Sequence, residues 1–361
     1  MLLFFYNIKI MMMNILNGIK ILDFSRLLPG PMATKQLMQM GAEVIKIEHP
    51  NKPELTRLIP PFEDGISVSY LMVNKGKEVR QIKYETEEGR NEIYKLVKEV
   101  DVLIETFRPG TMQKLGFDYE TLKMINPQLI YVSCTSYGQS GPYAHLAGHD
   151  LNFMAYSGLL ANNVNQDGNI TMPSYQVADL YGGTEQIINS VLLGIIQRSK
   201  TEKGDWFDVS ITESALPMNA LLAPPVWYNE KAQAFDVLSG KLPHYSYYKC
   251  KDDKFVVLAG LEDKFWQNLC IKLGREDWKS ENLMTLIHRQ DIRQELIDLF
   301  LTKTRDEWVE FFQDTEVCFS PVLEFEETLT DPHFTEKGSY EFTEDGKHII
   351  GFNLGIRQLG H

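Results

Sequence analysis

Two side chains that can carry a proton, His149 and Asp179, stand in similar settings in this sequence. Gly148 precedes the histidine, and Leu-Tyr-Gly-Gly follows the aspartate, just ahead of an apolar helical pattern in each case. Histidine and aspartate are both common general acids and bases when their surroundings tune them. A pocket that receives the two groups from opposite sides has what a proton-transferring enzyme needs.

Each of these segments also has a purely structural interpretation. Asp150 and Asp179 both stand where a helical pattern begins, and aspartate is a favoured N-cap residue. The glycines after Asp179 favour a functional interpretation, because they let a ligand approach the backbone and a helix start offers N–H groups to an oxyanion. A helix N-terminus also disfavours the cationic form of His149, which suits a base. The residue pattern alone leaves both interpretations open.

His145 and His149 have, in addition, the i, i+4 spacing that metal ligands use on a helix. Glutamate does not follow His145, however, and Gly148 interrupts any helix between the two histidines. The four cysteines form no C-x-x-C pair and have no zinc spacing. We therefore predict no metal site, and scattered thiols of this kind indicate a reducing, cytoplasmic setting.

Length and charge disfavour several classes of protein. With 361 residues, 43% of them apolar, the chain can bury a sizeable core. A formal net charge of −13 argues against nucleic-acid binding, which needs a basic face. The apolar N-terminus contains Lys9 and lacks a small-residue cleavage site, so we interpret it as an upstream extension with initiation near Met13. Neither it nor any other run predicts membrane insertion.

The first half of the chain alternates between short β-rich runs and helical patterns. A run at 19–24, a Pro-Gly-Pro turn at 29–31, a helical pattern at 32–40 and a run at 42–47 make a βαβ unit. Further strands are expected at 102–104, 129–134 and 205–211, and further helices at 87–100, 119–125 and 187–200. The alternation predicts an α/β domain with a mainly parallel, Rossmann-like sheet.

A smaller domain is expected after this one. Composition shifts at 222–248, which is rich in Pro, Tyr, Ala and Gly. A strand at 255–259 and helices at 263–273, 291–301 and 305–312 follow. We predict a large α/β domain over 14–222, a small α+β domain over 223–320, and a C-terminal segment, 321–361, that returns to the large domain.

Cationic side chains gather in a region that is otherwise poor in them: Lys75, Lys77, Arg80, Arg108 and Lys114. A solvated face is the ordinary explanation for scattered lysines. The alternative is a ligand that carries phosphate, with Arg108 in a loop after a strand, where open α/β sheets bind ligands. The helix start after the Pro-Gly-Pro turn suits the same kind of ligand.

Several segments of the chain resemble the class III CoA-transferase superfamily of the CaiB/BaiF type. They are 22–31, 41–48, 101–110 (DVLIETFRPG), 126–131, 136–142 and 147–152 (AGHDLN). The resemblance runs from about residue 17 to the C-terminal region. It implies a large α/β domain and a small domain, with two subunits interlocked in a homodimer. The active site then lies between the large domain of one subunit and the small domain of the other.

Within that superfamily, the segment 147–152 is similar to the α-methylacyl-CoA racemases, since the transferases generally have no histidine there. The resemblance implies racemisation of a 2-methylacyl-CoA thioester, a reaction of fatty-acid metabolism, by 1,1-proton transfer. His149 and Asp179 would be the opposing acid/base groups. Glu262, in a GLEDKFW segment similar to the racemases' G-x-x-E-x-x-F/Y, would assist near His149.

The resemblance also implies an acyl-CoA substrate, with CoA as its carrier part and no separate metal or redox cofactor. His49 stands where the family commonly has an arginine. The residues expected to contact CoA are His49, Lys75, Lys77, Arg108, Ala147, Gly148, Asp150 and Asn152.

Two alternatives to a racemase remain. In a CoA-transferase, Asp179 would be a nucleophile that forms a mixed anhydride with the acyl group, and His149 would be incidental. A non-catalytic acyl-CoA-binding protein would keep only the fold.

Overall fold

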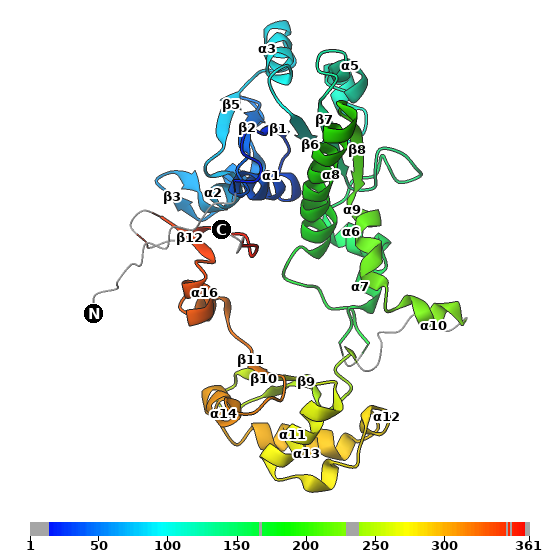
Figure 1. Ribbon diagram of the computed structural model, residues 1–361, viewed down its shortest axis with the longest axis vertical. Helices are drawn as coiled ribbons and strands as arrows, with labels where there is room; N and C mark the ends of the chain where they lie inside the picture. Colours follow the sequence, from blue (N-terminus) through cyan, green and yellow to red (C-terminus); the bar gives the residue numbers. More distant parts are fainter. Residues whose placement is uncertain (1–13, 166–167, 229–237, 344–345, 347–348, 358–361) are drawn as a thin grey trace. The chain divides into compact units, whose positions relative to one another are not determined.

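The computed structural model describes residues 14–165, 168–228, 238–343, 346 and 349–357 (Figure 1). The N-terminal segment interpreted as an upstream extension lies outside the described residues. The chain forms two compact units. The first comprises the chain up to Met218 and again from Pro332, and the second is Asn219–Asp331.

The first unit is built on a six-stranded sheet in the order β5-β2-β1-β6-β7-β8, with every neighbouring pair parallel. The strands are β1 Lys20–Phe24, β2 Glu43–Glu48, β5 Glu78–Gln81, β6 Val102–Glu105, β7 Ile130–Thr135 and β8 Trp206–Ser210. The chain moves outward from β1 to β5, returns to β6, and moves outward again to β8. The predicted α/β fold with a parallel sheet is therefore confirmed, and its switch point lies between β1 and β6.

Both faces of the central strands β1, β6 and β7 are buried. Along β1, Ile21 packs into one apolar core and Leu22 and Phe24 into another; β6 repeats the pattern, with Val102 in the first core and Leu103 in the second. Successive side chains of a strand point to opposite faces, so continuous apolar runs are what a doubly covered sheet requires.

The covering helices are α1 Pro29–Gln39, α3 Glu87–Val97, α4 Thr111–Leu115, α5 Tyr119–Lys123 and α8 Gln186–Thr201. The first unit also contains α2 Val68–Asn74, α6 Asp150–Tyr156, α7 Leu159–Asn162, the π-helix η2 Ala178–Glu185, α9 Ile211–Ala215 and α16 Pro332–Glu336. Short pieces complete it: the 3-10 helices η1 Leu55–Leu58 and η3 Leu216–Asn219, and the hairpin of β3 Phe62–Glu63 and β4 Ile66–Ser67.

The C-terminal hairpin of β12 Tyr340–Phe342 and β13 Ile349–Phe352 is tied to α1. Lys35 and Gln39 donate from α1 to the carboxylate of Glu341 at 2.9 and 2.7 Å. The return to the first unit comes at Pro332, later than the expected residue 321. Glu327 keeps the intervening segment in the second unit through ion pairs with Lys254 and Arg305.

The second unit packs helices on a three-stranded antiparallel sheet, β11-β10-β9. Its elements are α10 Ala223–Trp227, β9 Tyr245–Lys249, β10 Phe255–Ala259, α11 Asp263–Leu273, η5 Glu276–Trp278, α12 Leu283–Leu286, α13 Gln290–Phe300, α14 Arg305–Phe312, β11 Phe319–Pro321 and α15 Phe325–Thr328. Trp266, Trp278, Trp308 and Phe300 fill its core.

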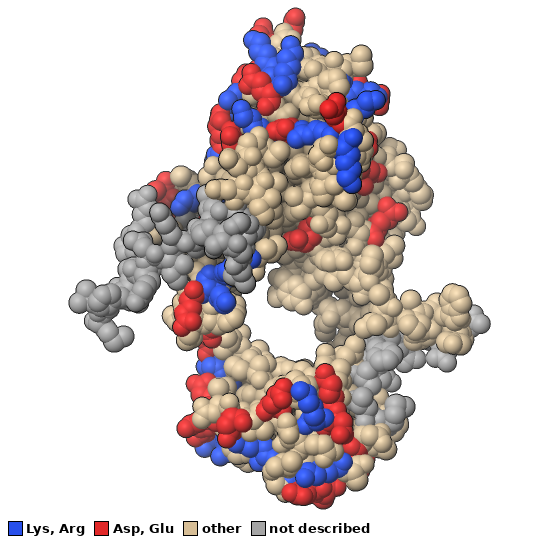
Figure 2. All heavy atoms as spheres, viewed as in Figure 1, with Lys and Arg blue, Asp and Glu red and all other residues tan. Residues whose placement is uncertain are grey.

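Acidic and basic side chains are interspersed on the visible face of the second unit (Figure 2). Across the described residues, no helix combines the length and the apolar character that a membrane crossing requires.

Candidate functional site

The carboxyl edge of the parallel sheet gathers the loops that carry the candidate residues. The loop after β1 leads into α1, the segment after β7 leads to His149 and α6, and α9 follows β8. The backbone N–H of Arg26, after β1, donates to Oγ1 of Thr106, after β6, at 3.0 Å. Open α/β sheets bind ligands at this edge, beside the switch point.

His149 occupies the N-cap position of α6, with an exposed side chain. The side chain of Asn152 accepts a hydrogen bond from the backbone N–H of His149 at 3.1 Å, which fixes the entry into the helix. The structural interpretation of Asp150 as the N-cap is therefore wrong, because α6 begins at Asp150 itself. The carboxylate of Asp150 is free to bond elsewhere.

Asp150 connects this segment to Asp179. Its Oδ1 accepts a hydrogen bond from the backbone N–H of Asp179 at 2.9 Å. The residue beside His149 thus contacts the second candidate directly, and the structure brings the two segments together. Burial, and then the negative charge of Asp150, raise the pKa of Asp179 to about 7. A carboxyl group tuned in this way can give or take a proton near neutral pH.

Asp179 lies in the first turn of η2, an eight-residue π-helix that continues into α8. It does not cap the helix, since the N-cap residue is Val177. The expectation of free N–H groups is wrong at this point, because the N–H groups of Asp179 and Leu180 already donate to Asp150 and to the carbonyl of Gln176. π-Helical turns are rare and often mark functional sites.

The glycines after Asp179 serve packing. A Cβ on Gly182 would lie 2.5 Å from the carbonyl oxygen of Ile211 in α9, and one on Gly183 would lie 2.7 Å from Cβ of Pro29 in α1. Next to them, the hydroxyl of Thr184 donates to the carbonyl of Pro29 at 2.9 Å. These glycines thus face neighbouring helices and not a bound ligand, and they fix η2 against α1 and α9.

Replacing Asp150 with asparagine removes the negative charge at this position but keeps a hydrogen-bond acceptor. In the Asp150→Asn protein the amide oxygen can still accept the hydrogen bond from the backbone N–H of Asp179, but the negative charge that raises the pKa of Asp179 is removed. The pKa of Asp179 should therefore fall below its value of about 7. Carboxyl ¹³C NMR of aspartate-labelled protein measures it; an unchanged titration midpoint would contradict the assigned electrostatic coupling.

A buried charge cluster lies beneath the loop that follows β1. Asp23 accepts the backbone N–H of Ser25 at 2.8 Å and Nζ of Lys77 at 3.1 Å. Lys77 also donates to the carbonyl of Pro31 at 2.9 Å, and Lys46 donates to that of Ser25 at 2.7 Å. Burial raises the pKa of Asp23, but Lys46 and Lys77 outweigh it and hold the pKa well below the usual range. The same burial lowers the pKa of Lys77 to about 7.

Asp23→Asn should therefore destabilise the protein strongly. It leaves the buried ammonium group of Lys77 without its carboxylate, while Lys46 keeps Glu54 as a partner. Breaking a buried ion pair typically costs about 3–5 kcal/mol. Urea denaturation measures the free energy of unfolding. Glu120→Gln, which breaks the exposed pair of Glu120 with Lys123, is the control and should change little. Equal effects of the two substitutions would argue against the cluster as a source of stability.

The residues expected to contact CoA fall into two groups. Lys77 belongs to the buried cluster, and His49 is buried with its Nε2 2.8 Å from the carboxylate of Glu85. Lys75, at the end of α2, and Arg108, in the loop after β6, are exposed. Neither has an ion-pair partner within the described part of the chain. Ala147 is also exposed, and Gly148, Asp150 and Asn152 surround His149 at the start of α6.

Glu262 belongs to the second unit, where it is the N-cap residue of α11 and is exposed. Its expected action beside His149 stays a prediction.

Sequence reasoning did not identify Glu105, the last residue of β6. Its side chain is buried and accepts the backbone N–H of Phe107 at 2.7 Å. Burial raises its pKa to about 7. The sequence signal that could have identified Glu105 is an acidic residue at the end of the apolar run that precedes Arg108.

Comparison with known proteins finds relatives along almost the whole chain. Residues 16–357 match CoA-transferase family III. The chain is 30% identical to human alpha-methylacyl-CoA racemase over 337 residues, which cover 91% of this chain and 83% of the relative. It is 31% identical to human succinyl-CoA:glutarate CoA-transferase over 330 residues, or 90% and 75%. A crystal structure of a CAIB/BAIF family protein from Brucella suis superimposes with a TM-score of 0.84 at 26% identity, covering 96% of this chain and 93% of that one.

Proposed function

The chain belongs to CoA-transferase family III, and we propose that it racemises a 2-methylacyl-CoA thioester by 1,1-proton transfer through an enolate. His149 serves one face of the α-carbon and Asp179 the other. The hydrogen bond between Asp150 and the backbone of Asp179 carries the proposal, because it joins the histidine segment to the aspartate.

The substrate's chemistry requires such a pair. Sulfur donates poorly into the thioester carbonyl, so the α-proton is more acidic than that of an ester. Inversion requires removal of a proton from one face and delivery to the other, and a single base would return the proton to the face it left. Asp179, with a pKa of about 7, can perform either step near neutral pH.

Exposed cations at the site support binding of the CoA phosphates. Arg108 follows β6 at the switch point of the sheet, where its guanidinium can bond phosphate in a bidentate manner. Lys75 adds a second exposed cation at the end of α2. Because the chain carries a net charge of −13, these local cations matter for an anionic ligand.

We also propose a homodimer. Leu193 and Ile196 are more than half exposed on α8, and Trp227 and Tyr228 are 84% and 76% exposed at the end of α10. Exposed apolar surface of this kind is typical of protein–protein contacts. Light scattering should give the mass of two chains; a single-chain mass at micromolar concentration would contradict the dimer.

CoA transfer is the second candidate. The identity to human succinyl-CoA:glutarate CoA-transferase equals that to the racemase within a percentage point. In that reaction the carboxylate of Asp179 would attack the thioester carbonyl, expel CoA thiolate and form a mixed anhydride. A half-buried carboxylate at the same site fits either chemistry.

One experiment separates the candidates. The protein is incubated with a single enantiomer of a 2-methylacyl-CoA in D₂O, with and without a free carboxylic acid, and the α-position is followed by NMR and chiral chromatography. Deuterium incorporation with inversion supports the racemase. Transfer of CoA to the free acid without exchange supports the transferase and contradicts the racemase. Binding of CoA with neither activity leaves a non-catalytic acyl-CoA-binding protein.

A further inference from the structure

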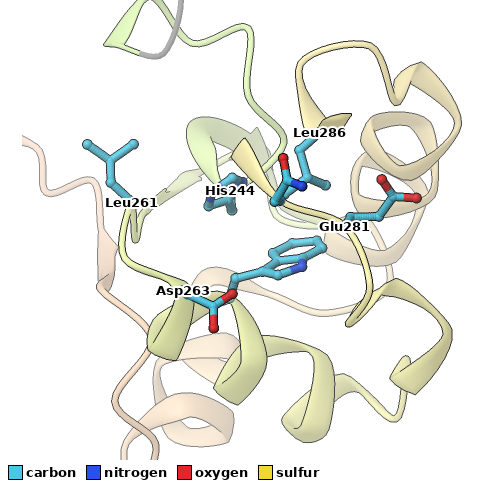
Figure 3. A pocket seen from close by; sticks show the side chains of 7 residues that line it. His244, Leu261, Asp263, Glu281 and Leu286 are labelled. Carbon is cyan, nitrogen blue, oxygen red and sulfur yellow. The ribbon is translucent and has the colours of Figure 1, made fainter. Parts of the chain in front are cut away.

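Glu105 is a buried acid to which the proposed reaction assigns no step. It ends β6 at the carboxyl edge of the sheet, and only 3% of the residue is exposed. The pocket around His244 in the second unit is different, because the residues on both sides of Glu262 line it, and it belongs with the expected action of that acid (Figure 3). The role of Glu105 follows from the groups that its carboxylate holds.

Neutral donors and an apolar ring surround the carboxylate of Glu105. Its Oε2 accepts the backbone N–H of Phe107 at 2.7 Å, and the side chain of Ser133 also donates to it. Ser133 is the register partner of Glu105 on β7, and its Oγ accepts the indole N–H of Trp206 on β8 at 3.0 Å. On β1 the register partner is the buried Phe24. Hydrogen bonds hold this carboxylate, and no cation of the described residues pairs with it.

The titratable groups that face Glu105 do not favour its ionised form. They are Asp208 on β8, with Tyr131 and Cys134 on β7. Burial raises the pKa of Glu105 to about 7, and the charge of Asp208 adds a smaller contribution. Because this pKa is higher in the folded chain than in the unfolded chain, stability falls as the pH rises from the usual glutamate range to about 7. Stability at neutral pH therefore does not explain a glutamate at this position.

The bond to Phe107 fixes the loop that carries Arg108. The ring of Phe107 packs against the core on this face of the sheet, so the residue is held by both its N–H and its ring. Oγ1 of Thr106 accepts the N–H of Arg26 at 3.0 Å and joins the loop to the one that follows β1. Arg108 comes next, and it is exposed. The direction in which the chain leaves β6 thus determines where the guanidinium group lies.

We propose that Glu105 is a positioning residue for CoA binding, whose carboxylate holds the N–H of Phe107 and thereby places Arg108 for the CoA phosphates. This role rests on the proposed function, in which Arg108 contacts those phosphates, and it is the same for racemisation and for CoA transfer. A charged acceptor forms a stronger hydrogen bond than a neutral one, which favours a carboxylate over an amide at the start of this loop.

Calorimetric titration of the full chain with CoA tests the role without requiring turnover. Glu105→Leu removes the acceptor and should raise the Kd for CoA about tenfold at pH 8.5. Arg108→Ala should also raise the Kd, because it removes the phosphate contact. Since Glu105 acts through Arg108, adding Glu105→Leu to Arg108→Ala should raise the Kd further by less than about twofold.

Asp101→Asn is the matched control at the opposite end of β6. The carboxylate of Asp101 accepts the backbone N–H of Lys20 at 2.8 Å and pairs with Arg198 at 2.9 Å. It therefore also holds the backbone next to the strand, but far from the loop of Arg108. The Kd for CoA should stay within about twofold of that of the unaltered protein.

Glu105→Gln distinguishes positioning from a purely structural role, and it decides the matter if Glu105→Leu fails to fold. Because it keeps only a neutral acceptor, its Kd should exceed that of the unaltered protein about threefold at pH 8.5 and match it at pH 6, where Glu105 is protonated. Lys77, Asp179 and the CoA phosphates titrate in both proteins, so the comparison removes their contribution. Urea denaturation at pH 8.5 should show no loss of stability, so unfolding would not account for the weaker binding.

Three results would overturn the role of Glu105. They are an unchanged Kd for the Glu105→Leu protein, full additivity with Arg108→Ala, and a difference between the Glu105→Gln and unaltered proteins that is the same at both pH values. In each case the unaltered protein still binds CoA, so the proposed function stands. An unaltered protein that does not bind CoA would instead contradict the proposed function, and the role of Glu105 with it.

Discussion

Asp179→Asn should reduce racemisation of a 2-methylacyl-CoA by about 10²–10⁴-fold in both directions, and should reduce α-proton exchange from the enantiomer whose α-proton faces Asp179. Asparagine has nearly the same size and can keep its backbone N–H on Asp150, so the packing of η2 against α1 and α9 should survive. It can neither give nor take the proton. Since inversion needs one group on each face, losing one stops the passage of the proton between faces. Deuterium incorporation from each enantiomer measures the effect.

Glu185→Gln is the matched control, because Glu185 is an exposed acid in the same π-helix. It should exchange at close to the rate of the unaltered protein. If Asp179→Asn keeps racemisation within about threefold of the unaltered rate, Asp179 is not an acid/base group. If it loses CoA transfer instead, in a protein that never exchanged the α-proton, the nucleophile role is supported.

His149→Ala should affect the two enantiomers unequally. For the enantiomer whose α-proton faces His149, the base is lost, and exchange should fall by about 10²–10⁴-fold. For the other, Asp179 can still remove the proton and return deuterium to the same face. Exchange then continues with retention, and racemisation stops in both directions. Chiral chromatography combined with mass spectrometry distinguishes retention from inversion.

His145→Ala is the control, since His145 is an exposed histidine in the same segment. It should retain both exchange and inversion. An equal loss for the two enantiomers of the His149→Ala protein would indicate a general disturbance of the loop. No loss for either would show that His149 takes no part, and would favour the transferase.

The sequence predicts most of the large unit because its central strands are continuous apolar runs. The strands β1, β6 and β7 are almost entirely buried, and the apolar runs identify these strands, with β2 and β8, within one or two residues. The edge strand β5, Glu78–Gln81, is different. Its side chains are mostly exposed and carry no apolar strand pattern, so the sequence predicts no strand there.

The candidate site depends on contacts that no local pattern contains. His149 and Asp179 can be selected by residue type and by resemblance, but the bond from Asp179 to Asp150 exists only in the folded chain. Lys77 illustrates the opposite error. Its neighbours in the sequence suggest an exposed side chain that binds phosphate. The folded chain instead places its ammonium group beneath the loop after β1, against Asp23. Burial of a charge is a tertiary property, and neighbours in sequence do not reveal it.

The π-helical start of α8 has a consequence for insertions and deletions. A π-helix holds more residues per turn than an α-helix, so η2 corresponds to an α-helix that has gained a residue. Removing one residue from 182–185 should let the segment wind as an α-helix while α8 keeps its place on the sheet. Asp179 would then rotate by about 100° about the helix axis, the angle of one α-helical residue. A one-residue deletion should thus turn the carboxylate of Asp179 away from its present direction, and with it the glycines that pack against α1 and α9.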